Sequence, residues 1–227
     1  MITLSLVLPV HNEEAVVEKA VIDIAKVLDK NKINYELILV ENGSRDKSLD
    51  VIKKMAQKNK RFKVLIAKKG YGSAILAGLK EAKGEYVGYI DSDGQDDAEA
   101  IPLLLNKLEE GKADLAKGKR KTRESLKRLI ISRCFNLITN ILFPIGDWDI
   151  NAKPKIWHKK WTKILNLKSK DSFICPELMI KAKKSHLRVW EIPVNNYARD
   201  DSNSTFGMRT IMEFVINLIK YRFRYKK

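Results

Sequence analysis

Hydrophobic and polar positions follow two periods in the first half of the chain. Continuous apolar runs predict short buried strands at 2–10, 35–40, 62–67 and 86–90. Apolar residues at helical spacing predict helices near 17–28, 49–56, 73–82 and 102–108. Strands that are apolar throughout and joined by helices are typical of parallel sheets. The expected fold class is therefore α/β, a Rossmann-like, mostly parallel sheet with helices on both faces.

The pattern is less regular after a fifth expected strand at 114–118. The later elements are expected as an amphipathic helix at 129–143, a polar turn at 146–151, a helix near 177–182 and a strand at 187–192. The end of the chain also has a helical pattern, with apolar positions at Ile211, Phe214, Val215, Leu218 and Ile219. No linker composition divides the chain. We expect one domain over 1–207 and a basic, amphipathic C-terminal helix over 208–227.

Composition and charge narrow the function classes. The 227 residues are 44% hydrophobic and 32% charged, which excludes a disordered or low-complexity chain. The formal net charge is +16, but residues 1–111 hold 17 basic and 18 acidic side chains, whereas 112–227 hold 27 and 10. An excess confined to one half suggests a nucleic acid, an anionic membrane surface or a phosphorylated substrate as partner.

Cysteine use and hydropathy bear on localisation. Cys134 and Cys175 lie far apart with no zinc-ligand spacing, which favours a reducing cytoplasm. The first ten residues lack the pattern of a signal peptide. The longest apolar stretch, 126–145, is interrupted by charges, so it is not expected to span a bilayer. Its amphipathic pattern, with Leu126, Leu129, Ile130, Arg133 and Leu137, favours a helix lying at a membrane surface, although such a stripe can also face a core.

Candidate chemistry gathers where the expected strands end. Polar residues follow strands one to four at 11–13, 41–44, 70–72 and 91–95. In a parallel sheet these loops meet at one edge, where ligands bind. Asp91 and Asp93 would repel each other unless a cation lay between them, and Mg²⁺ or Mn²⁺ suits such oxygen ligands, with Gln95 adding a carbonyl oxygen. The alternative is a solvated acidic turn.

Other sites find little support in the sequence. The spacing of Gly70 and Gly72 is too short for a dinucleotide fingerprint, and no phosphate-binding P-loop motif is present. No Ser/His/Asp or Cys/His pattern indicates nucleophilic hydrolysis. Asn42-Gly43 can be an ordinary turn, and His11 an ordinary loop residue. Asn12 is a candidate cap for the first helix.

Four ordered motifs carry a resemblance to a known family. They are Leu8-Pro9-Val10-His11-Asn12-Glu13, Val40-Glu41-Asn42-Gly43-Ser44, Gly70-Tyr71-Gly72 leading to Gly78, and Asp91-Ser92-Asp93-Gly94-Gln95. Weaker matches follow at 118–120, 132–133, 149–155 and 191–194. The chain resembles the family 2 glycosyltransferases of GT-A fold, and within them the dolichyl-phosphate mannosyltransferase-like, or polyprenyl-phosphate, group.

The resemblance implies a nucleotide-sugar donor bound by the first part, about 1–118, and an acceptor bound by about 119–207. It implies a donor pocket lined by Pro9, His11, Glu13, Glu41 and Gly70. It also implies that Asp91, Asp93 and Gln95 hold Mg²⁺ or Mn²⁺ on the diphosphate, and that Asp91, Asp93, Arg120 and Arg133 carry the chemistry. The reaction would be inverting transfer of a hexose, from a donor of GDP-mannose or UDP-glucose type, to a polyprenyl phosphate at the cytoplasmic membrane face.

Arg120 and Arg133 suit a lipid phosphate because a guanidinium binds phosphate oxygens in pairs. Two departures affect specificity. Asn42 replaces the second acid of one motif, which bears on the donor base. The family pattern DxxSGFR is here Asp149-Ile150-Asn151-Ala152-Lys153-Pro154-Lys155, which bears on the acceptor or sugar pocket.

Alternatives remain open. The acceptor could be a soluble glycan or protein, and a nucleotidyltransferase would also need a metal at the sheet edge. A nucleic-acid binding protein fits the basic charge but lacks a recognition motif, so no nucleic-acid partner is expected. Donor base, sugar and oligomeric state are not indicated.

Overall fold

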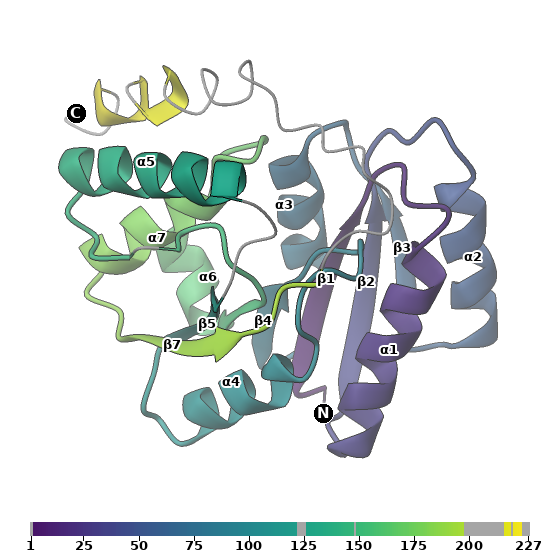
Figure 1. The fold of residues 1–227 in the computed structure, drawn as a ribbon. Coiled ribbons are helices and arrows are strands. Elements are labelled where there is room, and N and C mark those ends of the chain that lie inside the picture. Colours follow the sequence, from purple (N-terminus) through teal and green to yellow (C-terminus); the bar gives the residue numbers. More distant parts are fainter. Residues whose placement is uncertain (1, 122–125, 148, 198–215, 219, 224–227) are drawn as a thin grey trace.

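The computed structural model describes residues 2–121, 126–147, 149–197, 216–218 and 220–223, with the backbone alone at 126–128. A central seven-stranded sheet separates two layers of helices (Figure 1). The strand order is β3(Phe62–Ile66), β2(Tyr35–Glu41), β1(Leu4–Val10), β4(Tyr86–Tyr89), β6(Lys155–His158), β5(Leu115–Arg120) and β7(Val189–Val194). The expected α/β class and mostly parallel sheet are confirmed.

Strand β6 is the exception to the parallel arrangement. It pairs antiparallel with both β4 and β5. The sequence did not indicate this strand, because Lys155 and His158 interrupt its short apolar pattern. In the register of β4 and β6, Tyr89 lies opposite Lys155. Lys153, two residues before β6, forms an ion pair with Asp91, two residues after β4, so a lysine lies beside the acidic loop.

Helices cover both faces of the sheet, as expected. One layer consists of α1(Val17–Lys30), α2(Ser48–Lys58) and α4(Ala100–Glu109). The other consists of α3(Tyr71–Glu81), α5(Leu126–Leu142), α6(Lys160–Leu165) and α7(Ile174–Lys184). Each layer has its own hydrophobic cluster, and β1 contributes alternately to the two, with Leu6 and Leu8 on one face and Val7 on the other. This double burial explains why the strands read as continuous apolar runs.

The expected cap of the first helix is wrong. Helix α1 begins at Val17 and has no side-chain cap. Asn12 instead adopts a left-handed backbone (φ 55°), and its Oδ1 accepts a hydrogen bond from the Arg45 amide at 2.8 Å. Asn12 therefore joins the loop after β1 to the loop after β2, because its side chain satisfies an amide in the neighbouring loop.

Helix α5 is amphipathic, as expected, and extends slightly further toward the N-terminus. Phe135 in the helix and Phe143 just past its end pack in the core. Ile130, Leu137 and Ile141 are exposed. Within the described part of the chain, no helix is long and apolar enough to cross a membrane.

The described part of the C-terminal segment is helical at 216–218 and 220–223. Leu218 is fully buried, and the Tyr221 ring lies against Phe143 and Phe173, at centroid distances of 5.9 Å and 5.0 Å. This helix lies beside α5 (Figure 1). The expected positions Ile211, Phe214, Val215 and Ile219 fall outside the described residues.

Candidate active site

The loops after β1, β2 and β4 meet at the carboxyl edge of the sheet. The Asn12 amide donates to Ser44 Oγ at 3.1 Å, which links the first two loops. Ser92 Oγ donates to the Pro9 carbonyl at 2.7 Å, which links the acidic loop to β1. The convergence expected from parallel topology is therefore present, and Pro9 lies at its centre.

Glu41 organises the loop after β2. Its side chain is buried, and Oε1 accepts hydrogen bonds from the amides of Gly43, at 2.7 Å, and Ser44. His11 lies on the adjacent loop, and its buried Nδ1 has no hydrogen-bond partner among the described residues. The Glu13 amide donates to Ser48 Oγ at 2.8 Å. His11, Glu13 and Glu41 therefore lie at one edge of the sheet. Their contact with a nucleoside stays a prediction.

The glycines at the start of α3 allow a close approach of the chain. A Cβ added at Gly70 would lie 2.4 Å from the Lys170 carbonyl oxygen, and one added at Gly72 would lie 2.2 Å from that of Ser169. The Ser73 amide donates to the Lys170 oxygen at 3.0 Å. Packing against 169–171 is thus sufficient reason for glycine here, and a donor contact of Gly70 stays a prediction.

Asp91 is held from two sides. Tyr71, on α3, donates its hydroxyl to Asp91 Oδ1 at 2.6 Å. The Lys153 ammonium forms an ion pair with Asp91 Oδ2 and lies 5.2 Å from the centre of the Tyr71 ring. Both side chains are mostly buried. Sequence analysis did not select Tyr71 or Lys153, and the signal for Lys153 was its departure from the family motif.

Asp93 and Gln95 belong to a loop that is tied to the segment after β7. The Gln95 amide donates to Asp93 Oδ1 at 3.0 Å, and Gln95 Nε2 donates to the Tyr197 carbonyl at 3.1 Å. The Tyr197 amide returns a bond to the Gln95 carbonyl at 2.9 Å. These hydrogen bonds within the protein fix the path of the loop.

A third carboxylate, that of Asp96, contacts the backbone of this loop. Asp96 Oδ2 accepts a hydrogen bond from the Asp91 amide at 3.2 Å. Burial is the main cause that raises the pKa of Asp96 to about 7; the negative charge of Asp91 adds to this effect and the charge of Lys153 opposes it.

The donor set suits a divalent ion with few protein ligands. No group of three or more His, Cys, Asp or Glu side chains in a metal-binding arrangement occurs within the described ranges. Mg²⁺, however, is commonly bound through one or two carboxylates, with water and substrate phosphates completing its shell. The oxygens of Asp91, Asp93 and Gln95 fit that pattern because they are hard ligands on one short, half-exposed loop.

The two arginines of the sequence analysis have different surroundings. Arg120, at the end of β5, forms a bidentate ion pair with Asp149. Its Nη2 donates to Oδ1 at 2.6 Å and its Nε donates to Oδ2 at 3.1 Å. Although burial acts in the opposite direction, this pair raises the pKa of Arg120, and the charges of Asp96 and Asp91 add to the effect. Arg120 therefore lies within electrostatic range of the acidic loop, whereas Arg133 is exposed on α5.

A buried lysine positions the partner of Arg120. Lys117 Nζ lies 2.9 Å from both carboxylate oxygens of Asp147, 3.0 Å from the Asp149 carbonyl and 2.9 Å from Glu191 Oε1. The ammonium thus joins β5, the 146–151 turn and β7. Sequence analysis missed this centre because a lysine in a strand usually points to solvent.

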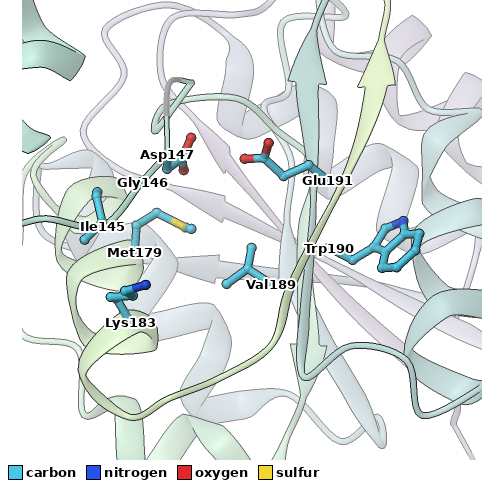
Figure 2. Close-up of a pocket in the computed structure, with 8 residues that line it drawn as sticks. All are labelled: Ile145, Gly146, Asp147, Met179, Lys183, Val189, Trp190 and Glu191. Atoms are coloured by element: carbon cyan, nitrogen blue, oxygen red, sulfur yellow. The ribbon is translucent and has the colours of Figure 1, made fainter.

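A separate pocket of about 470 Å³ lies between α7, β7 and the loop before β6 (Figure 2). Its walls include Met179, Lys183 and Trp190. None of the site residues selected from the sequence lines this pocket. Asp147 and Glu191 point toward each other at its upper edge (Figure 2), where both contact Lys117.

Comparisons with known proteins agree with this arrangement. Dodecaprenyl-phosphate galacturonate synthase of Rhizobium johnstonii is 28% identical over 98% of this chain and 68% of its own length. An undecaprenyl-phosphate 4-deoxy-4-formamido-L-arabinose transferase of Shewanella sediminis is 27% identical over 95% of this chain and 65% of its own length. The chain spans about two thirds of the length of these relatives.

Among solved structures, glucosyl-3-phosphoglycerate synthase from Mycobacterium tuberculosis, in complex with Mn²⁺, UDP and glucosyl-3-phosphoglycerate, has a similar fold. The TM-score is 0.75 at 20% identity, over 97% of this chain and 79% of the other. The family description "Glycosyl transferase family 2" matches residues 5–169, well over half of the chain. From this match, and from the GT-A arrangement of its sheet, the chain belongs to glycosyl transferase family 2.

Proposed function

We propose that this protein transfers a hexose from a nucleoside-diphosphate sugar to a polyprenyl phosphate, with inversion at the anomeric carbon. The observation that carries the proposal is the acidic loop, with Asp91 and Asp93 at the end of β4, where the loops after β1 and β2 also meet. Residues of about 1–118 would bind the donor and residues of about 119–207 the acceptor.

The residues of the loop have defined tasks in this reaction. Asp91, Asp93 and Gln95 would hold Mg²⁺ or Mn²⁺ against the diphosphate. When bound, the ion neutralises charge that develops on the departing nucleoside diphosphate. Arg120, which is held by Asp149, would add positive potential at the same edge. Pro9, His11, Glu13, Glu41 and Gly70 would line the nucleoside pocket.

A phosphate acceptor requires little acid–base chemistry. A phosphate monoester is already anionic near neutral pH, so it can attack the anomeric carbon without a general base. It does require cationic contacts, and residues 112–227 hold 27 basic against 10 acidic side chains. The two relatives described above are named for transfer involving dodecaprenyl phosphate and undecaprenyl phosphate, which supports this acceptor class.

The membrane part of the proposal rests on α5. Its exposed apolar residues Ile130, Leu137 and Ile141 lie on one side of the helix, and Arg133 is exposed nearby. Such a surface suits the headgroup layer of an anionic membrane. We propose peripheral association at the cytoplasmic face.

The deciding experiment supplies labelled donor with and without undecaprenyl phosphate. We expect label in the organic phase only when the lipid is present, and loss of the product in excess chelator. Water-soluble product formed without lipid would instead support a soluble glycan or protein acceptor. The anomeric configuration of the product, determined by NMR, tests inversion.

The donor is identified by thermal shift. A panel of GDP- and UDP-sugars, each with and without Mn²⁺, should give one nucleotide that raises the melting temperature in a Mn²⁺-dependent manner. Equal shifts with and without the ion would contradict the metal assignment.

A further inference from the structure

The ion pair between Lys153 and Asp91 places a protein cation where a divalent ion is expected. Strand β6 pairs antiparallel with β4, and Lys153, two positions before β6, forms an ion pair with Asp91, two positions after β4. The amine is not a flexible surface group, because the Lys153 side chain is only 16% exposed and lies against the Tyr71 ring. Its position is therefore built into the sheet.

The surroundings favour a permanent charge on this amine. The ammonium forms an ion pair with the Asp91 carboxylate and lies over the face of the Tyr71 ring, and both contacts favour a positive charge. Arg120, a second mostly buried cation in this part of the protein, is paired with Asp149. Lys153 is thus the cation in direct contact with Asp91.

We infer that Lys153 is a resident cation of the donor site, which shares Asp91 with the divalent ion and contacts the diphosphate of the bound donor. The inference rests on the proposed function and deepens it. It predicts two opposite effects of Lys153. In the free protein, its charge opposes entry of a second cation beside Asp91. In the donor complex, it binds phosphate oxygens directly, as a lysine does in other phosphate sites.

The test starts with Mn²⁺ alone, measured as free ion by EPR at pH 7. Lys153→Met removes the charge and keeps the length of the side chain. We expect Mn²⁺ to bind this variant roughly tenfold more tightly than the native protein, or more, because two like charges a few ångströms apart repel strongly even at an intermediate dielectric. Lys153→Arg, which keeps the charge, should bind Mn²⁺ as the native protein does.

Three further variants control the interpretation. Lys54→Met removes one exposed lysine on α2 and should leave Mn²⁺ affinity unchanged. Tyr71→Phe removes the other hydrogen bond to Asp91 without changing charge, so its effect should be smaller than that of Lys153→Met. Asp93→Asn should weaken Mn²⁺ binding in both the native and the Lys153→Met background, which locates the ion on this loop.

The second readout is affinity for UDP and for GDP in excess chelator, measured by calorimetry. Lys153→Met should lose at least about tenfold of the metal-independent affinity for the nucleotide that the native protein prefers. Unchanged Mn²⁺ affinity in Lys153→Met, or no Mn²⁺ binding to any variant, would overturn the inference. Undiminished nucleotide affinity in chelator would overturn it as well.

The two proposals can fail separately. The Mn²⁺ titration uses neither donor nor acceptor, so its result does not depend on the sugar or on the lipid. A native protein that makes no lipid-linked product, yet shows the expected Mn²⁺ difference, would contradict the proposed acceptor and leave Lys153 as a resident cation. If the native protein makes lipid-linked product but Lys153→Met binds Mn²⁺ no more tightly than the native protein, the proposed acceptor is supported and the role of Lys153 is contradicted.

Discussion

Two aspartates of one short loop have different surroundings. Asp91 has a hydrogen bond from Tyr71 and an ion pair with Lys153, so its replacement would disturb both neighbours. Asp93 is half-exposed and accepts the Gln95 amide within its own loop. Asp93 is therefore the better position for testing the metal site without altering the packing.

Asp93→Asn should lower kcat/KM by about two orders of magnitude or more, because losing a metal carboxylate removes several kcal/mol of transition-state stabilisation. The melting temperature should change little, since the residue is half-exposed. Activity is measured with labelled donor and lipid phosphate. Asp50→Asn, on the exposed side of α2, is the matched control. Native activity in Asp93→Asn would contradict the metal assignment.

Arg133→Ala tests the acceptor side of the proposal. Arg133 is exposed on α5 and belongs to the part of the chain proposed to bind the acceptor, so donor affinity should stay constant. The KM for lipid phosphate should rise roughly tenfold, the effect expected when a charged hydrogen bond of about 1.5 kcal/mol is lost. The measurement is a titration of polyprenyl phosphate at saturating donor. An unchanged acceptor KM would remove Arg133 from the acceptor site.

At the scale of elements, the start of α3 and the segment 169–171 form a unit through backbone contacts. Gly72→Ala should reduce the free energy of unfolding by about 1–3 kcal/mol, because the new methyl meets fixed carbonyl oxygens of Ser169 and Asp171 at 2.2 Å and 2.7 Å. Gly111→Ala is the comparison, since nothing lies within 4 Å of its added Cβ. Its positive φ of 67° gives backbone strain alone, about 1 kcal/mol.

Urea unfolding of both glycine variants separates the two effects. A larger loss of stability in Gly72→Ala than in Gly111→Ala is expected. Equal losses would show that 169–171 moves aside easily.

At the scale of the whole molecule, two buried lysines lie opposite each other in the sheet. Lys117 pairs with Lys155 across β5 and β6, and both are fully buried. Lys117 is neutralised by Asp147 and Glu191, whereas Lys155 Nζ donates to the Ile150 carbonyl at 2.8 Å. Burial is the main cause that lowers the pKa of Lys155 to about 8. Other charged or titratable groups around it include Tyr89, Cys175, Lys117, Lys153 and Asp147.

This lowered pKa makes stability depend on pH. Between about pH 8 and the usual lysine value near 10.4, the unfolded chain binds more protons at Lys155 than the folded one, so this residue's contribution to stability rises with pH. Below about pH 8, Lys155 is charged in both the folded and the unfolded protein, so the full cost of burying its charge lowers the stability. Relative to Lys155→Met, the native protein should therefore gain about 2–3 kcal/mol between pH 8 and pH 10.5.

Chemical unfolding of both proteins across that pH range provides the measurement. The quantity to compare is how the difference in unfolding free energy between the two proteins changes with pH. Loss of the bond to Ile150 in Lys155→Met shifts that difference by the same amount at every pH. A difference that is independent of pH would show that Lys155 has the same pKa in the folded and the unfolded protein, so that it stays charged when folded.

The exposed face of α5 gives a prediction for membrane binding. Replacing Leu137 and Ile141 by Gln should weaken binding to anionic vesicles about tenfold or more, because each side chain contributes about 1.5 kcal/mol or more when buried. Vesicle sedimentation measures the effect. Leu103→Gln, on α4 in the opposite helix layer, is equally exposed to solvent and should leave binding unchanged. Equal binding of all variants would contradict an interfacial α5.

The sequence predicted the elements whose signals are local. Apolar period and turn residues identified β1 to β5, β7 and most helices, because each of these is buried in a way that its own residues record. Parallel topology then brought Pro9, His11, Glu41 and Asp91 to one edge without further information.

Contacts made by the antiparallel strand could not be predicted in this way. Strand β6 has only four residues and a mixed pattern, so neither its existence nor its partners can be inferred locally. Lys153, just before this strand, contacts Asp91, just after β4, and the register of β6 with β5 places Lys155 opposite Lys117. Pairing between segments roughly 40 to 70 residues apart is decided by the packing of the whole sheet. The sequence by itself therefore determined the fold class and the acidic loop, and only the tertiary structure decided which cation lies against it.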